Sequence, residues 1–589
     1  MRIKFLTLTA VILLVLGSCS STETTSTQAG QLTASHEEAE AWATKTLEGL
    51  TLEQKAAQML FEVLDTSYMA EDHPKFQYFV ELVRDYDLGG FVLSGGTPQD
   101  AARLLNRLQK EAKIPVFVSN AFESGPGQML RGASEFPPNM AFSAIGDEKL
   151  AEQAGRIGAR EGRAMGVHIT WSPTVDILTR PENPVQGGRS FGGDLDLLGR
   201  MAAAYIKGYQ DNAMYATAKH FPGRGDVDLI PGTEFTINNK PADRVENEDF
   251  LSFKLAIDAG VTFIMSDHIA VPSVTGGSDM PGSVEPQLAT YWLREKLGFQ
   301  GVLITDDMWY KKVMDRFGVV ESCVMAIKAG HDAILKPGDA KATVQGLAEA
   351  VRNGDIPEEQ INNSVKKLLY YKARLNLHRN RYVDEDKVSA HVAVQEHREF
   401  VQTVADRSLT LLKNDGYFPS DTAKVGKVFH LCIQRNEEDA APAVASTKMA
   451  AAFPIETNIV IRPNTSERLY REALSAAEKA DTVVVSLFNP RIRYIDNGPL
   501  REQDLNLIRR IIRIKPKATV VVSYGNPFPV ENLKDASAFV LGYGEGGFYG
   551  NQLVYIDSFI KLLKGDISPQ GKIPIMVSEN FPMGTGVVY

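Results

Sequence analysis

Short apolar runs alternate with longer amphipathic stretches through the first two thirds of the chain. Eight of these runs predict β-strands, at residues 57–61, 90–93, 115–119, 167–171, 215–219, 261–266, 302–305 and 333–335. Between them, apolar residues recur at helical spacing, as over residues 147–165 and 319–329. Strands that alternate with helices predict parallel pairing, and eight such units predict a TIM-like (β/α)₈ barrel.

A second α/β pattern follows a polar, charged segment at residues 379–398, which predicts a linker. Five further strand candidates lie at residues 427–433, 457–461, 482–488, 518–524 and 538–542. Helical patterns separate these candidates, so we expect an open parallel sheet in an α/β sandwich. The predicted organisation is a barrel over residues 37–378 and a second domain over residues 399–589.

The first residues predict an export signal rather than part of the fold. A basic start precedes the apolar residues 5–16, which are too few to span a bilayer as a mature helix of about 20 residues. Cys19 follows directly, so residues 1–19 resemble a lipoprotein signal in which Cys19 becomes lipidated. Residues 20–36 predict a flexible tether. We expect an exported bacterial lipoprotein with a lipid anchor in a cell-envelope membrane, the outer membrane in a Gram-negative cell; a plain secretory signal is the alternative.

Composition narrows the classes of partner. The chain has 589 residues, 44% hydrophobic, and a formal net charge of −10, which argues against nucleic acid as a partner. No Cys-x-x-Cys or His-Glu-x-x-His spacing occurs, so no metal site is predicted. Cys323 and Cys432 stand in apolar surroundings and predict buried thiols rather than a disulfide. No cofactor is implied.

Polar residues gather where the predicted barrel strands end, which is where barrel enzymes carry their active sites. In strand order these residues are Glu123, Asp176, Lys219 with His220, Asp267 with His268, Asp306 with Asp307, and Lys336. Asp306, after the seventh strand, is the candidate catalytic carboxylate at this position. The alternative is that Asp306 or Asp307 only caps the next helix.

Several longer motifs resemble glycoside hydrolase family 3, most of all its β-N-acetylglucosaminidase (β-N-acetylhexosaminidase) branch. They lie at residues 183–192, 218–223, 293–299 and 301–307, with further similarity at 407–414 and 565–574. The resemblance implies hydrolysis of a terminal β-linked N-acetylhexosamine, or a related sugar, by a retaining mechanism with Asp306 as nucleophile. It implies that Arg189, Lys219 and His220 bind sugar hydroxyls, and we add Glu123 and His268 as candidate substrate contacts.

The sequence departs from that branch at two places. The branch carries an Asp-Ser-His whose His is the acid/base, but here the expected Asp and His fall on Ile230 and Gly232. The Asp that holds two sugar hydroxyls after the third strand is replaced by Ala121. Replacement acid/base candidates are Asp228, Glu234, Asp267 and, in the second domain, Glu545.

Three hypotheses follow from these departures. The first is a β-N-acetylhexosaminidase-like hydrolase with a replacement acid/base. The second is a surface carbohydrate-binding protein that has lost turnover, and the third is a glycosidase of altered sugar specificity.

Overall fold

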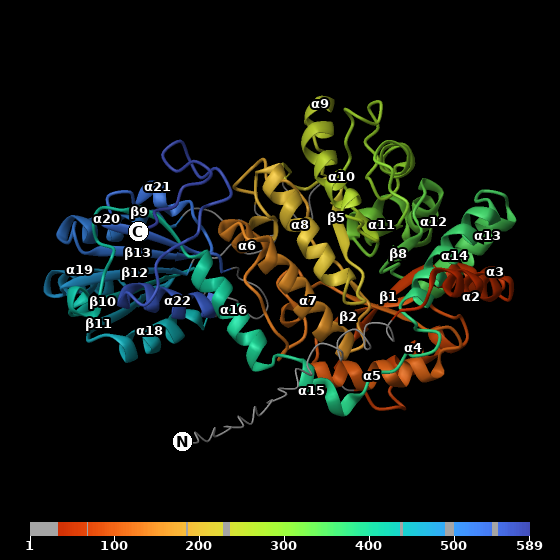
Figure 1. Cartoon of the computed structure of the whole chain (residues 1–589). Helices are drawn as coiled ribbons and strands as arrows, with labels where there is room; N and C mark the ends of the chain where they lie inside the picture. The colour runs from red at the N-terminus through yellow and green to blue at the C-terminus, as the bar shows by residue number, and fades with distance from the viewer. Residues whose placement is uncertain are drawn as a thin grey trace, which may run out of the picture.

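The computed structural model describes residues 33–589 except for Tyr68, 184–185, 228–235, 436–439, 489–499 and 545–551. It forms two lobes, each built on its own sheet (Figure 1). The strands of the first sheet are β1 Leu60–Asp65, β2 Gly90–Ser94, β3 Phe117–Asn120, β4 Ile169–Thr170, β5 Thr217–Phe221, β6 Phe263–Ser266, β7 Val302–Asp307 and β8 Ala333–Leu335.

These strands pair in parallel in the order β4-β3-β2-β1-β8-β7-β6-β5. A parallel bridge between Ile169 and Tyr215 brings the two ends of the sheet together. The sheet is therefore a nearly closed barrel, and the predicted α/β barrel is confirmed.

Helices surround the barrel (Figure 1). The longer ones are α2 His36–Glu48, α3 Leu52–Gln58, α4 Pro74–Arg84, α5 Pro98–Glu111, α6 Asn139–Ile145, α7 Glu148–Ala164, α8 Leu195–Gln210, α10 Leu251–Asp258, η4 Gln287–Lys296, α11 Lys311–Phe317, α12 Val319–Ala329, α13 Ala340–Arg352 and α14 Glu358–Arg374. Short turns of helix are η1 Pro126–Gln128, η2 Gly187–Arg189, α9 Ala242–Arg244 and η3 Val245–Phe250.

The first strand lies later in the chain than the sequence pattern predicts. Residues 57 and 58 end α3, whose first turn is fixed by a capping box between Thr51 and Gln54. Ala56 and Ala57 are buried on that helix, so their apolar character reflects a helix face rather than a strand. The strand itself begins at Leu60.

The second domain contains the strands and helices that follow α16 Gln395–Ser408. They are β9 Thr410–Asn414, α17 Thr422–Val425, β10 Val428–Gln434, α18 Ala441–Ala452, β11 Ile455–Ile461, α19 Glu467–Lys479, β12 Thr482–Phe488, α20 Glu502–Ile514, β13 Thr519–Tyr524, α21 Pro529–Asn532, β14 Ala538–Gly542 and α22 Gln552–Lys564. The sheet order is β11-β10-β12-β13-β14-β9.

The expectation of a purely parallel second sheet is wrong at one edge. β9, absent from the predicted strands, pairs antiparallel with β14, whereas the other strands pair in parallel. Only Leu409 separates β9 from α16, so this strand enters the sheet without a crossover helix. Strand direction depends on such connections, which the pattern of apolar residues does not reveal.

The two domains meet along a packed junction. Met140, Ala141 and Leu178 of the barrel domain belong to the apolar core of the second domain. The Gly193 N–H donates to the Pro574 carbonyl at 2.9 Å. Gly192 has a φ of +121°, and a Cβ there would lie 2.4 Å from that same carbonyl oxygen. The chain just after Ser190 thus rests directly on the second domain.

Residues 379–398, predicted as a linker, contain η5 Glu385–Lys387, α15 Val388–His391 and the first turn of α16. Cys323 and Cys432 are buried free thiols, as predicted. Within the described part of the chain, no helix is both long and apolar enough to cross a membrane.

Candidate active site

A pocket of about 510 Å³ opens at the carboxyl ends of the barrel strands. Its charged and imidazole-bearing lining residues are Glu123, Lys219, His220, Arg224, Asp267, His268, Asp306, Asp307 and Lys336. Apolar walls come from residues such as Trp171, Met265 and Leu335. Because successive parallel strands end at the same rim, residues from β3, β5, β6, β7 and β8 converge on one cavity.

Asp306 projects into this pocket from the end of β7, whose first four residues are buried. Its Oδ2 accepts a hydrogen bond of 2.5 Å from Arg224 Nη2, and its Oδ1 accepts one of 2.8 Å from the Asp307 N–H. Burial raises the pKa of Asp306, but Arg224 and His268 outweigh it and hold the pKa well below its usual range. Asp306 is thus an ionised carboxylate, and its side chain keeps 21% of its surface exposed.

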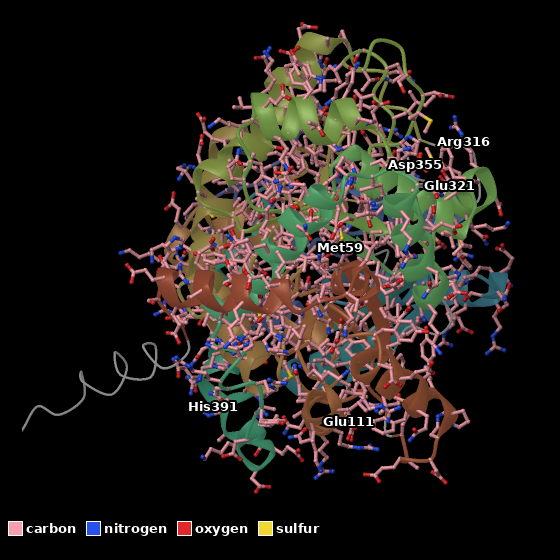
Figure 2. The ribbon with its side chains drawn as sticks, turned by 90° about the vertical axis from the view of Figure 1, so that its right-hand side faces the viewer. Met59, Glu111, Arg316, Glu321, Asp355 and His391 are labelled. Carbon is pink, nitrogen blue, oxygen red and sulfur yellow. The ribbon has the colours of Figure 1, made fainter. Side chains whose placement is uncertain are left out.

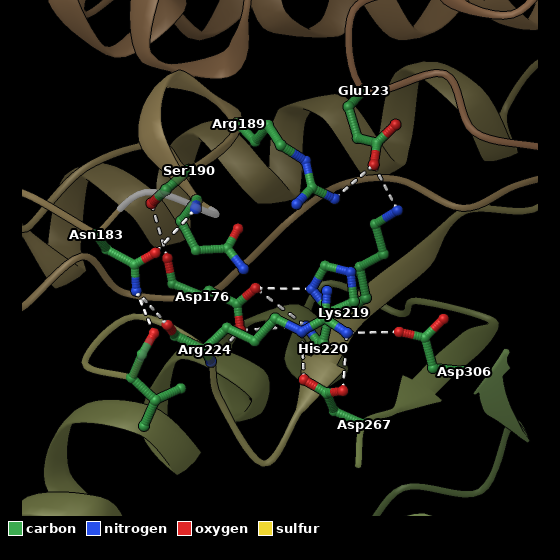
Figure 3. A network of polar contacts seen from close by, with 12 residues as sticks. Glu123, Asp176, Asn183, Arg189, Ser190, Lys219, His220, Arg224, Asp267 and Asp306 are labelled. Carbon is green, nitrogen blue, oxygen red and sulfur yellow. Dashed lines mark hydrogen bonds and ion pairs between the residues drawn. The ribbon is translucent and has the colours of Figure 1, made fainter. Parts of the chain in front are cut away.

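Arg224 joins Asp306 to Asp267 (Figure 3). Its Nε donates to Asp267 Oδ2, and its Nη2 donates to Asp267 Oδ1 at 2.7 Å. Since one nitrogen bonds both carboxylates, Asp306 Oδ2 and Asp267 Oδ1 lie within two hydrogen-bond lengths, at most about 5 Å apart. Asp267 was a candidate acid/base, but its bidentate ion pair ties both oxygens to Arg224.

Glu123 gathers two of the predicted sugar-binding cations at one oxygen (Figure 3). Its Oε1 accepts hydrogen bonds from Arg189 Nη2 at 2.8 Å and Lys219 Nζ at 2.6 Å. Its Oε2 accepts one from Gln128 Nε2 at 2.7 Å. The carboxylate therefore neutralises and orients both cations; Lys219 lines the pocket, whereas Arg189 is not among its lining residues.

His220 reaches the pocket from the end of β5, with its ring fixed from behind by Asp176. The distance from His220 Nδ1 to Asp176 Oδ2 is 2.9 Å, and the backbone N–H groups of His220 and Arg224 also donate to this carboxylate. Burial raises the pKa of Asp176 to about 7, although the Arg224 charge and these hydrogen bonds oppose the rise. Asp176 therefore orients both the imidazole and the start of the Arg224 loop.

His268, predicted as a substrate contact, lines the pocket but has both ring nitrogens engaged within the protein. Nδ1 lies 2.8 Å from Ser283 Oγ, and Nε2 lies 3.0 Å from the Asp307 carbonyl. The ring stacks on Tyr310. The Asp307 carboxylate accepts a hydrogen bond from Lys336 Nζ at 2.9 Å. His268 and Lys336 therefore both hold Asp307, the residue next to Asp306.

Three acid/base candidates, Asp228, Glu234 and Glu545, lie outside the described residues, as does Cys19. Sequence reasoning missed two of the pocket-lining residues, Arg224 and Gln128. A charged residue between Gly223 and Gly225, directly after a strand end, was the available signal for Arg224. Within the described residues, no group of three or more His, Cys, Asp or Glu side chains is arranged to hold a metal ion.

A pocket at the carboxyl ends of barrel strands, with an ionised carboxylate set among cations, has the position and the polar lining of an active site in a barrel enzyme. Residues 51–370 match the N-terminal domain of glycosyl hydrolase family 3, and the chain belongs to that family.

The chain is 25% identical over 555 residues to a β-N-acetylglucosaminidase/β-glucosidase of Cellulomonas fimi, covering 91% of this chain and 95% of that protein. It is 28% identical over 386 residues to β-hexosaminidase A of Pseudoalteromonas piscicida, covering 59% of this chain and 63% of that protein. Among solved structures, a family 3 β-N-acetylglucosaminidase from Paenibacillus sp. str. FPU-7 superimposes with a TM-score of 0.76 at 27% identity, covering 90% of this chain and 99% of that chain.

Proposed function

We propose that the protein hydrolyses a terminal β-linked N-acetylhexosamine, or a closely related sugar, with Asp306 as the nucleophile of a retaining mechanism. The carrying observation is the Asp306 carboxylate, kept ionised by Arg224 at the carboxyl end of a barrel strand. The N-acetylglucosaminidase and hexosaminidase relatives support the choice of sugar.

In this mechanism an Asp306 oxygen attacks the anomeric carbon as the bond to the leaving-group oxygen breaks. A proton reaches the leaving oxygen from the acid, and water later displaces Asp306 from the sugar. Lys219 and His220 would donate to ring hydroxyls, and Glu123 holds Lys219 and Arg189 in place for that contact.

The acid/base role is best assigned to Asp228 or Glu234, in the loop that follows β5 and lacks the Asp-Ser-His of the related branch. Arg224, which contacts the nucleophile, is followed four residues later by Asp228, and Glu234 lies in the same loop. Residues 224–227, at the start of this loop, are held in place because Asn183 Nδ2 donates to the carbonyls of Arg224 and Val227. Asp267 is less suited, since Arg224 occupies both of its oxygens.

The test compares an activated aryl N-acetylglucosaminide with an N-acetylglucosamine disaccharide. Asp306→Asn should lose turnover of both substrates. Asp228→Asn or Glu234→Gln, whichever removes the acid, should reduce disaccharide turnover by about 10²–10⁴-fold while sparing the aryl substrate, whose leaving group needs no proton. Asp315→Asn, at an exposed ion pair with Lys311, is the matched control. Equal inactivity of wild type and Asp306→Asn on both substrates would reject hydrolysis of this sugar.

A second candidate is a carbohydrate-binding protein without turnover. Both oxygens of Asp306 already accept hydrogen bonds, and Ala121 offers no carboxylate to the sugar. Titration calorimetry with N-acetylglucosamine distinguishes the cases: binding without turnover supports this candidate. If N-acetylglucosamine is neither bound nor released from its glycosides, and another aryl glycoside is cleaved, altered sugar specificity is supported.

We also propose that the protein is exported and anchored through a lipid on Cys19. The basic start, apolar segment and cysteine of residues 1–19 support this. Metabolic labelling with a fatty acid should mark the wild type and not Cys19→Ala, which should leave the membrane fraction. Labelling of both proteins would refute the anchor.

A further inference from the structure

A second, basic pocket of about 210 Å³ lies at the opposite end of the barrel from Asp306. It is formed by the end of α7, by His168 just before β4, and by residues 380–391. His391, at the end of α15, is labelled at the lower left of Figure 2. Because β4 begins at Ile169, His168 marks the amino ends of the strands.

Arg163 is the central feature of this pocket. Its Nε and Nη1 are buried and have no hydrogen-bond partner among the described residues. Burial lowers the pKa of Arg163 to about 10, which still leaves the guanidinium charged at neutral pH. Two buried N–H groups of a charged guanidinium without a partner carry a desolvation cost, so this arrangement lacks an acceptor such as a negatively charged group.

The other lining residues add positive charge. Arg381 and Lys387 line the pocket with Arg163, and Asp384 is the only carboxylate among the described lining residues. Asp384 is already paired with Lys387 at 2.7 Å. The positive charges also affect His391 on α15. Burial lowers the pKa of His391, and the charges of Arg160 and Lys387 lower it further.

His168 supplies a neutral donor. Its Nδ1 accepts a hydrogen bond from the Val118 N–H at 3.0 Å, so the neutral ring carries its proton on Nε2. Burial lowers the pKa of His168 well below its usual value, and Arg163 and Lys372 add to this effect. The ring thus stays neutral, and no partner for Nε2 occurs among the described residues.

We propose that this pocket binds a small tetrahedral oxyanion, a phosphate or the phosphate group of a small metabolite, between Arg163, His168 and Lys387. Arginine binds such groups through its planar N–H fork. Lys387 has three N–H donors, so it can give one to the oxyanion at the rim while it keeps its ion pair with Asp384. The bound oxyanion compensates Arg163 and ties residues 380–391 to α7. The site is separate from the sugar pocket and does not rest on the proposed hydrolase activity.

The experiment is thermal unfolding of the full chain with increasing inorganic phosphate at constant ionic strength, since a ligand that binds the folded state raises the Tm. We expect a saturable rise with phosphate and with sulfate. Acetate at equal ionic strength should give little rise, which separates a tetrahedral anion from a carboxylate. Glucose 6-phosphate serves as a small phosphate ester: saturation at lower concentration than with inorganic phosphate assigns a metabolite, and weaker saturation assigns free phosphate.

Arg163→Met should abolish the phosphate-dependent rise, whereas Arg156→Met, an exposed arginine on the same helix, should retain it. Lys387→Gln tests the site independently of folding, because the Lys387 side chain is 70% exposed; it should weaken phosphate binding about tenfold in calorimetry. No saturable rise in wild type, or an equal rise in Arg163→Met, would overturn the proposal. Unchanged affinity in Lys387→Gln would overturn the assignment of Lys387.

Discussion

Arg224 Nη2 lies 2.5 Å from Oδ2 of Asp306 and 2.7 Å from Oδ1 of Asp267. One guanidinium nitrogen therefore connects the proposed nucleophile to the carboxylate at the end of the neighbouring strand. The contact gives Asp306 a cation to stabilise its ionised form, and it commits Asp267 to an ion pair. The properties of Asp306 should consequently depend on Arg224.

Replacing Arg224 should move the acidic limb of the pH–activity profile. Asp306 must be ionised to attack, so activity is lost as pH falls through its pKa. Arg224→Met removes the cation that lowers this pKa, so the acidic limb of kcat/KM should shift upward by about 1–3 units. Arg224→Lys should shift it less, because a lysine retains the charge without the bidentate fork. An unmoved limb in Arg224→Met would contradict this electrostatic role.

Removing the Glu123 charge should destabilise the fold. Glu123→Gln leaves Lys219 and Arg189 near each other without their shared carboxylate, and breaking such a buried pair costs about 3–5 kcal/mol. Urea unfolding measures this loss. Glu148→Gln, at an exposed ion pair with Arg200, is the control and should cost less than about 1 kcal/mol. Similar losses in both variants would show that Glu123 is not the organising charge.

Asp176 should make stability depend on pH. Its pKa is raised from 3.8 to about 7, so the folded state binds the extra proton. Its contribution to stability is fully present below about pH 4 and is lost as pH rises towards 7. Asp176→Asn mimics the protonated acid. From pH 4 to pH 7 its free energy of unfolding should therefore fall by about 1–4 kcal/mol less than that of the wild type. Identical slopes for both proteins would disprove the raised pKa.

Trp309 should contribute to substrate affinity without supporting the fold. It is 62% exposed, two residues from Asp307, and next to the lining residue Tyr310. If the pocket takes a sugar as proposed, an exposed aromatic face beside it favours stacking on the sugar ring. Trp309→Ala should raise KM several-fold, leave kcat nearly unchanged and change stability by less than about 0.5 kcal/mol. Tyr291→Ala, an exposed aromatic on η4, should leave KM unchanged.

Much of the barrel was predictable because its strands are short apolar runs and its helices repeat at helical spacing. β8 and α12 begin and end where the pattern predicts. β1 was misplaced because Ala56 and Ala57 are equally suited to a buried helix face. The direction of β9 depends on a tertiary connection, which no local pattern encodes.

The site followed the same division. Lys219, His220 and Asp306 could be singled out because barrel chemistry lies at strand ends, and all three line the pocket; their roles stay predictions. Arg224 was missed because its importance comes from reaching across to β6 and β7, a contact between residues far apart in the chain. The structure also shows that His268 points its ring nitrogens at Ser283 and Asp307, which residue type alone could not show.

The contact between Gly193 and Pro574 sets the second domain against the segment that carries Arg189. Of the described pocket-lining residues, none comes from that domain. Yet Arg189, which bonds Glu123, lies only a few residues before the chain reaches Pro574. A mutant library selected for turnover or sugar preference should therefore recover substitutions around residues 572–574. A screen restricted to pocket-lining residues would miss these positions.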